Sequence, residues 1–279
     1  MLKSLIAHWL KEDIGEGDFT SQAIFPERSS AEARLLVKGE GVIAGVEVAK
    51  EIVTYVDPTA KFSILLPDGA WVKFGDVVFT VESNALSLLS CERLLLNCMQ
   101  RMSGIATKTR LLQNKIAHTH AKLLDTRKTT PGFRTLEKQA VLIGGGLNHR
   151  FGLFDMIMLK DNHIDFVGGV TMALKKVTEF KRKNNLTHKV EVEVRNLKEL
   201  AEVIAIEGAD RIMLDNFTPE EIHDALVLIP KGYEVEASGG INESNIVQYA
   251  ETGIDYISVG ALTHNIQSLD LSFKAIIRS

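Results

Sequence analysis

The middle of this sequence carries a group of basic residues that come directly after short apolar runs. The runs Leu123–Leu124 and Met156–Leu159 are typical of buried strands, and the basic residues follow them or lie on the loop between them. The group consists of Arg127, Lys128, Arg150 and Lys160, with His149 and Arg134 nearby. A scattered set of surface charges would instead lie on helix faces. The pattern therefore favours a binding site for an anion at one edge of a sheet.

The types of the basic residues indicate which anion. A guanidinium matches a carboxylate through two parallel hydrogen bonds, and a lysine ammonium, as a point charge, cannot replace it. We therefore interpret Arg127 and Arg150 as clamps for a compact dicarboxylate. His149 and His163 are candidates for a general acid or base, although a single histidine is equally well explained as a structural residue.

Two acidic residues, Glu193 and Asp215, each lie at the end of a later apolar run. Mg²⁺ prefers carboxylate oxygens and keeps several of its waters, so this pair predicts a magnesium site that is partly formed through water. The alternative is a purely structural ion pair with Lys128 or Lys160. Glu191 points to the same face of its strand as Glu193, so spacing alone does not decide which of the two faces the metal.

Glycines follow the last two strand-like runs. Gly239 and Gly240 come directly after Ser238, and Gly260 comes directly after Val259. Any one of them could be an ordinary turn. In barrels, however, the last two strand-to-helix loops often bind phosphate through backbone N–H groups. The triple glycine Gly144–Gly146 lacks the context of a nucleotide-binding loop, which predicts a flexible or close-packed loop that positions His149 and Arg150.

From residue 122 onward, short apolar runs alternate with helical patterns. The predicted strands are Lys122–Leu124, Met156–Leu159, Val190–Val194, Arg211–Leu214, Tyr233–Ala237 and Tyr256–Val259, and the predicted helices are Arg134–Ile143, Phe166–Lys183, Leu197–Glu207, Pro219–Leu228 and Ile241–Thr252. This alternation indicates parallel βαβ units. Polar residues at the C-terminal ends of all these strands favour an incomplete barrel, because an open sheet would gather them at one crevice.

The first third of the chain reads as a small α/β domain. Its predicted helices are 2–11 and 46–56, and its predicted strands are 31–37, 41–44, 62–66, 71–72 and 77–81. The phrase PDGAWVKFGDVVFTVES resembles lipoyl and biotinyl carrier domains, but Lys73 lacks the hairpin-tip setting of a modifiable lysine. We interpret the region as one wall of a cleft. Leu86–Ala117 predicts one long helix, or two with a kink at Gly104.

Composition excludes several classes of protein. A net charge of −4 over 279 residues argues against a general nucleic-acid or membrane binder. No apolar run approaches the roughly 20 residues of a membrane span, and the first residues do not fit a signal peptide. Cys91 and Cys98 are seven residues apart on a helical pattern, about 10 Å along the axis and beyond disulfide reach. Reduced thiols and a cytoplasmic location are expected.

Several blocks of the sequence resemble the quinolinate phosphoribosyltransferase family, whose members are also called nicotinate-nucleotide pyrophosphorylases (carboxylating). They are DTRKTTPGFR, GGGLNHR and LKDNHI, flanked in order by EDIGEGDFTS, ERLLLNCMQRMSGIAT, EVEV, IMLDNF, EASGGI and YISVG. The resemblance covers nearly the whole chain. It implies an α/β fold in which an N-terminal α/β sandwich domain with a connecting long helix (1–117) precedes an incomplete α/β barrel (118–264), with the tail 265–279 packed on the first domain.

The resemblance also implies a reaction in NAD biosynthesis. Quinolinate and phosphoribosyl pyrophosphate (PRPP) would give nicotinate mononucleotide, pyrophosphate and CO₂, with Mg²⁺ and without an organic cofactor. The catalytic residues implied are Lys128, Glu193 and Asp215, the metal ligands are Glu193 and Asp215, and the substrate-binding residues are Arg93, Thr126, Arg127, His149, Arg150, Lys160, Ser238, Gly239, Gly240 and Gly260. By itself Arg93 is an ordinary exposed helical arginine, and only the resemblance implies that it reaches the substrate across a homodimer interface.

Three alternatives fit parts of the pattern. A nicotinate phosphoribosyltransferase would need fewer cationic clamps for its monocarboxylate, and a molybdenum-operon relative is disfavoured by the intact block 160–163. A non-catalytic barrel that binds phosphorylated metabolites would not need both Glu193 and Asp215. The departures from the family blocks are Phe133, Gln139 and Arg195, of which only Arg195 could alter the charge near the metal site.

Overall fold

The structure, a computed structural model, describes residues 2–277. The chain divides into two compact units. The first contains Met1–Arg110, Thr129–Gly145 and Thr263–Ser279, and the second contains Leu111–Lys128 and Gly146–Leu262. Segment 129–145 thus belongs to the first unit, whereas the sequence-based division assigns it to the barrel domain. The α/β fold class is confirmed, with a four-stranded antiparallel sheet, a two-stranded antiparallel pair and a six-stranded parallel sheet.

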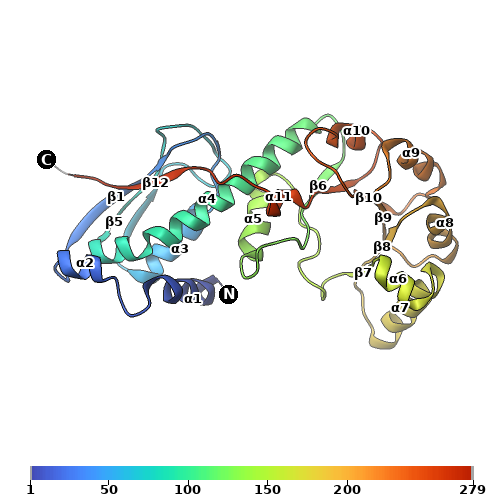
Figure 1. The fold of residues 1–279 in the computed structure, drawn as a ribbon, viewed down its shortest axis with the longest axis horizontal. Coiled ribbons are helices and arrows are strands. Elements are labelled where there is room, and N and C mark those ends of the chain that lie inside the picture. The colour runs from blue at the N-terminus through green and yellow to red at the C-terminus, as the bar shows by residue number, and fades with distance from the viewer. Residues whose placement is uncertain (1, 278–279) are drawn as a thin grey trace. The chain divides into compact units, whose positions relative to one another are not determined.

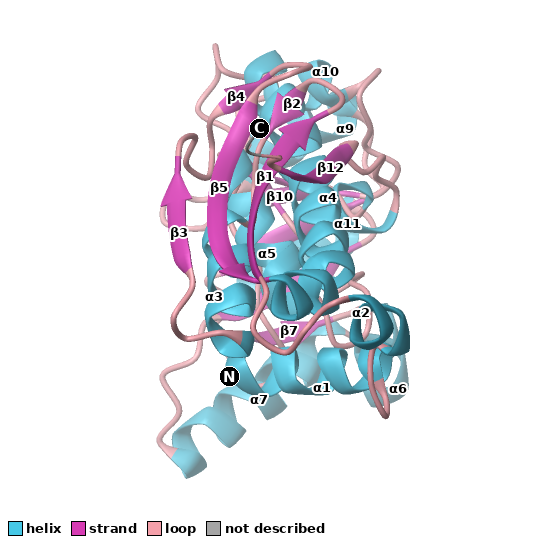
Figure 2. Ribbon diagram, turned by 90° about the vertical axis from the view of Figure 1, so that its left-hand side faces the viewer, coloured by secondary structure: helices cyan, strands magenta, loops and turns pink. Residues whose placement is uncertain are grey.

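The first unit is built on a four-stranded antiparallel sheet in the order β12-β1-β5-β3. Figure 2 shows its two long strands side by side, with β3 at one edge. The strands are β1 (Ser30–Val37), β3 (Lys61–Ile64), β5 (Val77–Asn84) and β12 (Leu271–Ala275), and a short pair is formed by β2 (Gly41–Val42) and β4 (Trp71–Val72). The C-terminal strand β12 therefore completes the sheet of the N-terminal region.

Three helices of the first unit precede the long central helix. They are α1 (Leu2–Ile14), α2 (Phe19–Ile24) and α3 (Val46–Val56). Helix α3 has the predicted bounds, because its apolar residues recur at helical spacing and face the core. Helix α2 is not predicted by the sequence analysis. It begins at a polar cap, where Asp18 accepts a hydrogen bond of 3.0 Å from the Ser21 backbone N–H.

The long helix α4 (Ala85–Lys115) is one continuous element, so the alternative of two helices with a kink at Gly104 is wrong. Gly104 is explained by close packing instead. A Cβ atom there would overlap the backbone carbonyl of Gln267, and it would lie 3.1 Å from the Cα of Ser268. The glycine lets the segment before β12 approach the helix.

Replacing Gly104 by alanine should destabilise the protein, although alanine is the better helix former. The gain of about 1 kcal/mol in helix propensity is outweighed by overpacking against backbone, which typically costs about 1–3 kcal/mol. We expect the melting temperature to fall by several degrees. Asn114→Ala, at an exposed position of the same helix, serves as the control and should leave it unchanged or slightly raised. A more stable Gly104→Ala variant would show that the close approach is not maintained.

Helix α5 (Arg134–Gly144) packs within the first unit through a glycine and a buried ion pair. A Cβ at Gly144 would lie 2.6 Å from the Ala106 carbonyl oxygen of α4, so the triple glycine begins as a close-packed segment. Glu137 is fully buried, and its Oε1 lies 2.7 Å from Nε of Arg101. Removing one partner of such a pair is costly, because the other charge stays buried.

The second unit contains a six-stranded parallel sheet in the order β6-β11-β10-β9-β8-β7. The strands are β6 (Lys122–Leu124), β7 (Ile157–Leu159), β8 (Val190–Val194), β9 (Arg211–Asp215), β10 (Glu234–Ser238) and β11 (Tyr256–Ser258). From β7 to β11 the strand order follows the sequence without the reversal that defines a doubly wound sheet. The first strand pairs with the last, as in a barrel, and β6 and β7 are the two ends of the row.

Helices cover the outer side of this row of strands, as Figure 1 shows for α7 to α10. They are α6 (Asp161–Val167), α7 (Val170–Asn184), α8 (Leu197–Ile206), α9 (Pro219–Leu228) and α10 (Ile246–Ala250), and the short helix α11 (Ala261–His264) follows β11. The sequence analysis predicts one helix over 166–183, but Gly168 and Gly169 have φ values of 92° and 121° and end α6 before α7 begins.

The predicted helix 241–252 is also shorter than expected. Its first residues form turns, because the Asn242 side chain accepts a hydrogen bond of 2.9 Å from the Ser244 backbone N–H. Among residues 2–277, no helix is both long and apolar enough to cross a lipid bilayer.

Candidate active site

The ends of the strand row set the positions of His149 and Arg150. Leu147 forms a parallel bridge with Leu124 of β6, so the chain after the triple glycine runs beside the first strand. The buried Asp125 then accepts a hydrogen bond of 2.9 Å from the His149 backbone N–H. This contact brings the loop that carries His149 and Arg150 to the C-terminal end of β6, where Arg127 also lies.

Arg127 and Arg150 are close enough to repel each other. Burial and the positive charge of Arg127 lower the pKa of Arg150, which is only 8% exposed. The Arg150 Nη1 donates to the Met156 carbonyl oxygen at 3.2 Å, which fixes the side chain. Arg127 and Lys128 are exposed at the strand end, and the Thr126 hydroxyl accepts a hydrogen bond from the Lys128 backbone N–H. Two neighbouring guanidinium groups of this kind favour an anionic ligand.

The acidic pair lies at the C-terminal ends of β8 and β9. Lys160 donates to Glu193 Oε2 at 2.6 Å, so Lys160 forms the ion pair that the structural alternative predicts. Burial, followed by the negative charge of Glu193, raises the pKa of Asp215. A cation between two neighbouring carboxylates offsets their repulsion, so these residues fit a magnesium ion.

The glycine segments follow β10 and β11, which pair with each other. Gly239 and Gly240 have φ values of 96° and 63°, a conformation that favours glycine. A Cβ at Gly239 would overlap the side chain of Asn216, the residue after Asp215. The loops after β9 and β10 are therefore in contact at the end of the strand row that carries the acidic pair.

The two candidate histidines have different surroundings. His163 is exposed, and its Nδ1 accepts a hydrogen bond of 3.0 Å from the Lys160 backbone N–H, so it caps the start of α6. His149 is buried, and its Nε2 lies 3.0 Å from Glu191 and 3.6 Å from Glu236. Burial opposes a charge on His149, but the carboxylates of Glu191 and Glu236 raise its pKa.

The structure also distinguishes Glu191 from Glu193. Both side chains leave the same face of β8, yet Glu191 is fully buried beside His149, whereas Glu193 reaches Lys160. Glu193 is therefore the residue next to Asp215, in agreement with the choice that the resemblance implies.

Arg93 and Arg134 belong to the first unit. Arg93 is exposed on α4, and the Arg134 Nε donates to the Thr129 hydroxyl at 2.9 Å. The role of Arg93 across a subunit interface stays a prediction. Arg195 forms two hydrogen bonds of 3.0 and 2.8 Å with Asp165 of α6, which accounts for the arginine at this position.

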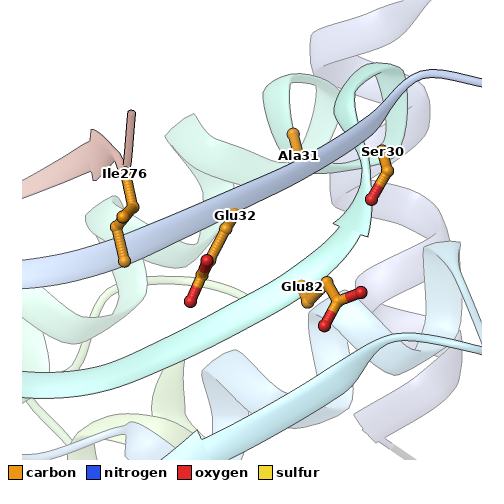
Figure 3. Close-up of a pocket in the computed structure, with 5 residues that line it drawn as sticks. All are labelled: Ser30, Ala31, Glu32, Glu82 and Ile276. Atoms are coloured by element: carbon orange, nitrogen blue, oxygen red, sulfur yellow. The ribbon is translucent and has the colours of Figure 1, made fainter. Parts of the chain in front are cut away.

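A hollow of about 300 Å³ lies on the sheet of the first unit (Figure 3). It is lined by Ser30, Ala31, Glu32, Glu82 and Ile276. Its two carboxylates give it a negative character, and it contains none of the predicted site residues. Such a lining does not suit an anionic ligand.

Some residues that shape the site are not found by the sequence analysis. Asn216 has φ 59° and its Nδ2 donates to Asp215 Oδ2 at 2.6 Å. Its position directly after a strand-ending aspartate is the signal that could have identified it, because asparagine tolerates a positive φ. Asp125 is expected from the sequence as a polar residue at a strand end, but its hydrogen bond with the His149 backbone N–H depends on the folded chain.

Two family models cover most of the chain. The quinolinate phosphoribosyl transferase C-terminal domain matches residues 105–274, and the corresponding N-terminal domain matches residues 18–103. A probable nicotinate-nucleotide pyrophosphorylase [carboxylating] from Bacillus subtilis is 44% identical, with 99% of this chain and 94% of the relative covered. The chloroplastic nicotinate-nucleotide pyrophosphorylase [carboxylating] of Arabidopsis thaliana is also 44% identical, with 98% and 82% covered.

A solved structure agrees with these matches. The nicotinate-nucleotide pyrophosphorylase from Francisella tularensis has a TM-score of 0.91 and 40% sequence identity, with 99% of this chain and 96% of that chain covered. Matches of this identity along nearly the entire length, together with the cationic and acidic groups at the strand ends, lead to one conclusion: the chain belongs to the quinolinate phosphoribosyltransferase family.

Proposed function

We propose that this chain transfers the phosphoribosyl group of PRPP to quinolinate and releases nicotinate mononucleotide, pyrophosphate and CO₂. The observation that carries the proposal is the pair of charge groups at the strand ends of the second unit. Arg127 and Arg150 form the cationic group, and Glu193 and Asp215 lie beside Lys160 in the other. A dicarboxylate and a magnesium-bound pyrophosphate need these two kinds of group.

In the proposed reaction, Arg127 and Arg150 hold the two carboxylates of quinolinate, with Thr126, His149 and Lys160 as further contacts. This places the ring nitrogen for attack on C1 of the ribose. The bond from C1 to pyrophosphate breaks as the bond to nitrogen forms, and the charge of Lys128 stabilises the departing group. The pyridinium then accepts the electron pair released when the 2-carboxylate leaves as CO₂, and the ring carbon takes up a proton.

Magnesium, when bound, would neutralise the charge on pyrophosphate. Glu193 and Asp215 are the residues that would hold it, because their carboxylates lie close together at the ends of neighbouring strands. The 5′-phosphate would contact the backbone of Ser238, Gly239, Gly240 and Gly260, in the loops where barrels often bind phosphate. No organic cofactor is required by this chemistry.

We further propose a homodimer in which Arg93 of each subunit completes the quinolinate site of the other. Its support is the family resemblance together with the exposure of Arg93 on α4. A cytoplasmic location is proposed from the two buried, unlinked cysteines.

The reaction is tested directly with the purified protein, quinolinate, PRPP and Mg²⁺. We expect nicotinate mononucleotide and CO₂ in equal amounts, and loss of activity when the metal is chelated. A parallel reaction with nicotinate in place of quinolinate serves as the comparison. Turnover of nicotinate without turnover of quinolinate would identify a nicotinate phosphoribosyltransferase. Binding of PRPP without product from either acid would identify a non-catalytic barrel.

A further inference from the structure

A buried group of charged residues lies among the strands of the second unit, and of its members only His149 is a proposed substrate contact. Its members are Glu191 on β8, Arg211 on β9, Glu236 on β10 and His149, and each is at most 8% exposed. The strand register brings them together. Glu191 is the register partner of Arg211, and Arg211 Nη1 donates to Glu236 Oε2 at 3.1 Å.

One oxygen of Glu236 lacks a hydrogen-bond partner among the described residues, and the hydrogen bonding of Glu191 is less complete still. Neither of its oxygens has a hydrogen-bond partner among the described residues, although Oε2 lies at ion-pair distance, 3.0 Å, from His149 Nε2. A buried carboxylate has to be compensated by nearby positive charge. Burial and the charge of Arg127 lower the pKa of Arg150, and the negative charge of Glu191 acts in the opposite direction. The buried carboxylate thus lies close to the proposed substrate clamp.

His149 connects Glu191 to Arg150. Its Nδ1 accepts a hydrogen bond of 2.7 Å from the Arg150 backbone N–H, while its Nε2 faces Glu191. The backbone N–H of His149 donates to Asp125. The ring is therefore held against protein groups on both sides, and it fixes the main chain of the arginine that follows it.

The buried group already contains a positive charge, the guanidinium of Arg211. The ligand atoms of His149, Glu191 and Glu236 lie within 4.8 Å of one another, a spacing that could hold a metal ion. Arg211 already supplies a positive charge there. Its guanidinium donates to Glu234 at 2.9 Å as well as to Glu236, and it stacks on the ring of Tyr256 at 4.2 Å.

We propose that Glu191 is a positioning residue that acts through His149 on Arg150 and thereby sets the affinity for the dicarboxylate substrate. The inference rests on the proposed role of Arg150 as a carboxylate clamp. Glu191 contributes in two ways. It holds the His149 ring that fixes the Arg150 main chain, and its negative charge offsets the repulsion between Arg127 and Arg150.

The test compares Glu191→Gln with Glu234→Gln. Both replacements remove a carboxylate near Arg211 and keep the side-chain shape, but Glu234 contacts Arg211 and Lys189 and is partly exposed. For Glu191→Gln we expect the KM for quinolinate to rise about tenfold, which corresponds to about 1.4 kcal/mol, with the KM for PRPP and kcat little changed. Glu234→Gln should leave both KM values unchanged. Equal rises in the two KM values of Glu191→Gln, or no difference between the two variants, would overturn the proposal.

Two further variants separate the possible failures. Arg150→Lys tests the clamp itself, and an unchanged KM for quinolinate in this variant would show that the clamp is wrongly assigned. If Arg150→Lys raises that KM and Glu191→Gln does not, only the positioning role fails. Should Glu191→Gln not fold, Glu191→Asp decides, because the shorter side chain withdraws the carboxylate from His149 Nε2 and leaves His149 itself unchanged. A selective rise in the KM for quinolinate supports the proposal, and an unchanged KM contradicts it.

Discussion

Replacing Arg127 by lysine is expected to raise the KM for quinolinate about 10- to 100-fold while the KM for PRPP stays within about threefold. The lysine keeps the positive charge but loses the two-pronged geometry, and one charge-assisted hydrogen bond contributes about 1.5–3 kcal/mol. The effect should be selective, because Arg127 lies beside Arg150 at the proposed quinolinate site. Steady-state kinetics with each substrate varied in turn would measure it.

Arg182→Lys provides the matched control, since Arg182 is exposed near the end of α7. It makes the same chemical change away from the cationic group and should leave both constants as they are. An equal rise of both KM values in Arg127→Lys would mean that Arg127 binds the phosphates of PRPP, and the assignment of anions to cations would have to be exchanged.

Replacing Asp215 by asparagine is expected to lower kcat/KM for PRPP about a hundredfold or more and to raise the Mg²⁺ concentration needed for half-maximal activity. The variant keeps the shape of the side chain and its neighbour Asn216, but it removes one of two carboxylates next to Lys160. Loss of a group that stabilises developing charge commonly lowers kcat by about 10²–10³. Magnesium titrations of activity at saturating quinolinate would measure both effects.

The control is Asp224→Asn, on the exposed side of α9. It should show the magnesium dependence of the unmodified protein. If Asp215→Asn also shows it, the acidic pair has the structural role that the Lys160–Glu193 ion pair alone would suggest, and the metal ligands lie elsewhere.

Much of the second unit could be predicted from local patterns. The strands β6 and β8 have the predicted bounds: the apolar pair Leu123–Leu124 ends at Asp125, and the alternating segment Val190–Val194 lies between Lys189 and Arg195. The polar residues that follow such strands could be assigned to one edge for the same reason, since parallel strands end together. Lys160, Glu193 and Asp215 are accordingly found close to one another.

The features that the sequence analysis does not predict have physical causes that the spacing of apolar residues does not reveal. The break between α6 and α7 depends on two glycines with positive φ inside an otherwise helical pattern. The partners of Glu191 depend on the register of β8, β9 and β10, and Glu191 and Glu193 are indistinguishable by strand alternation. A kink at Gly104 fits the local sequence, because the residue that packs against this glycine, Gln267, is more than 150 residues away in the sequence. Side-chain partners at such separations become visible only once the chain is folded.

The interleaving of the two units affects how the protein can be divided. The polypeptide passes from one unit to the other after residues 110, 128, 145 and 262. A gene fragment that encodes only 118–264 would carry helix α5 without α4, leaving the Glu137 carboxylate without Arg101. Neither unit can therefore be produced from a single uninterrupted piece of the gene, and swapping one half between relatives would require exchanging several segments together.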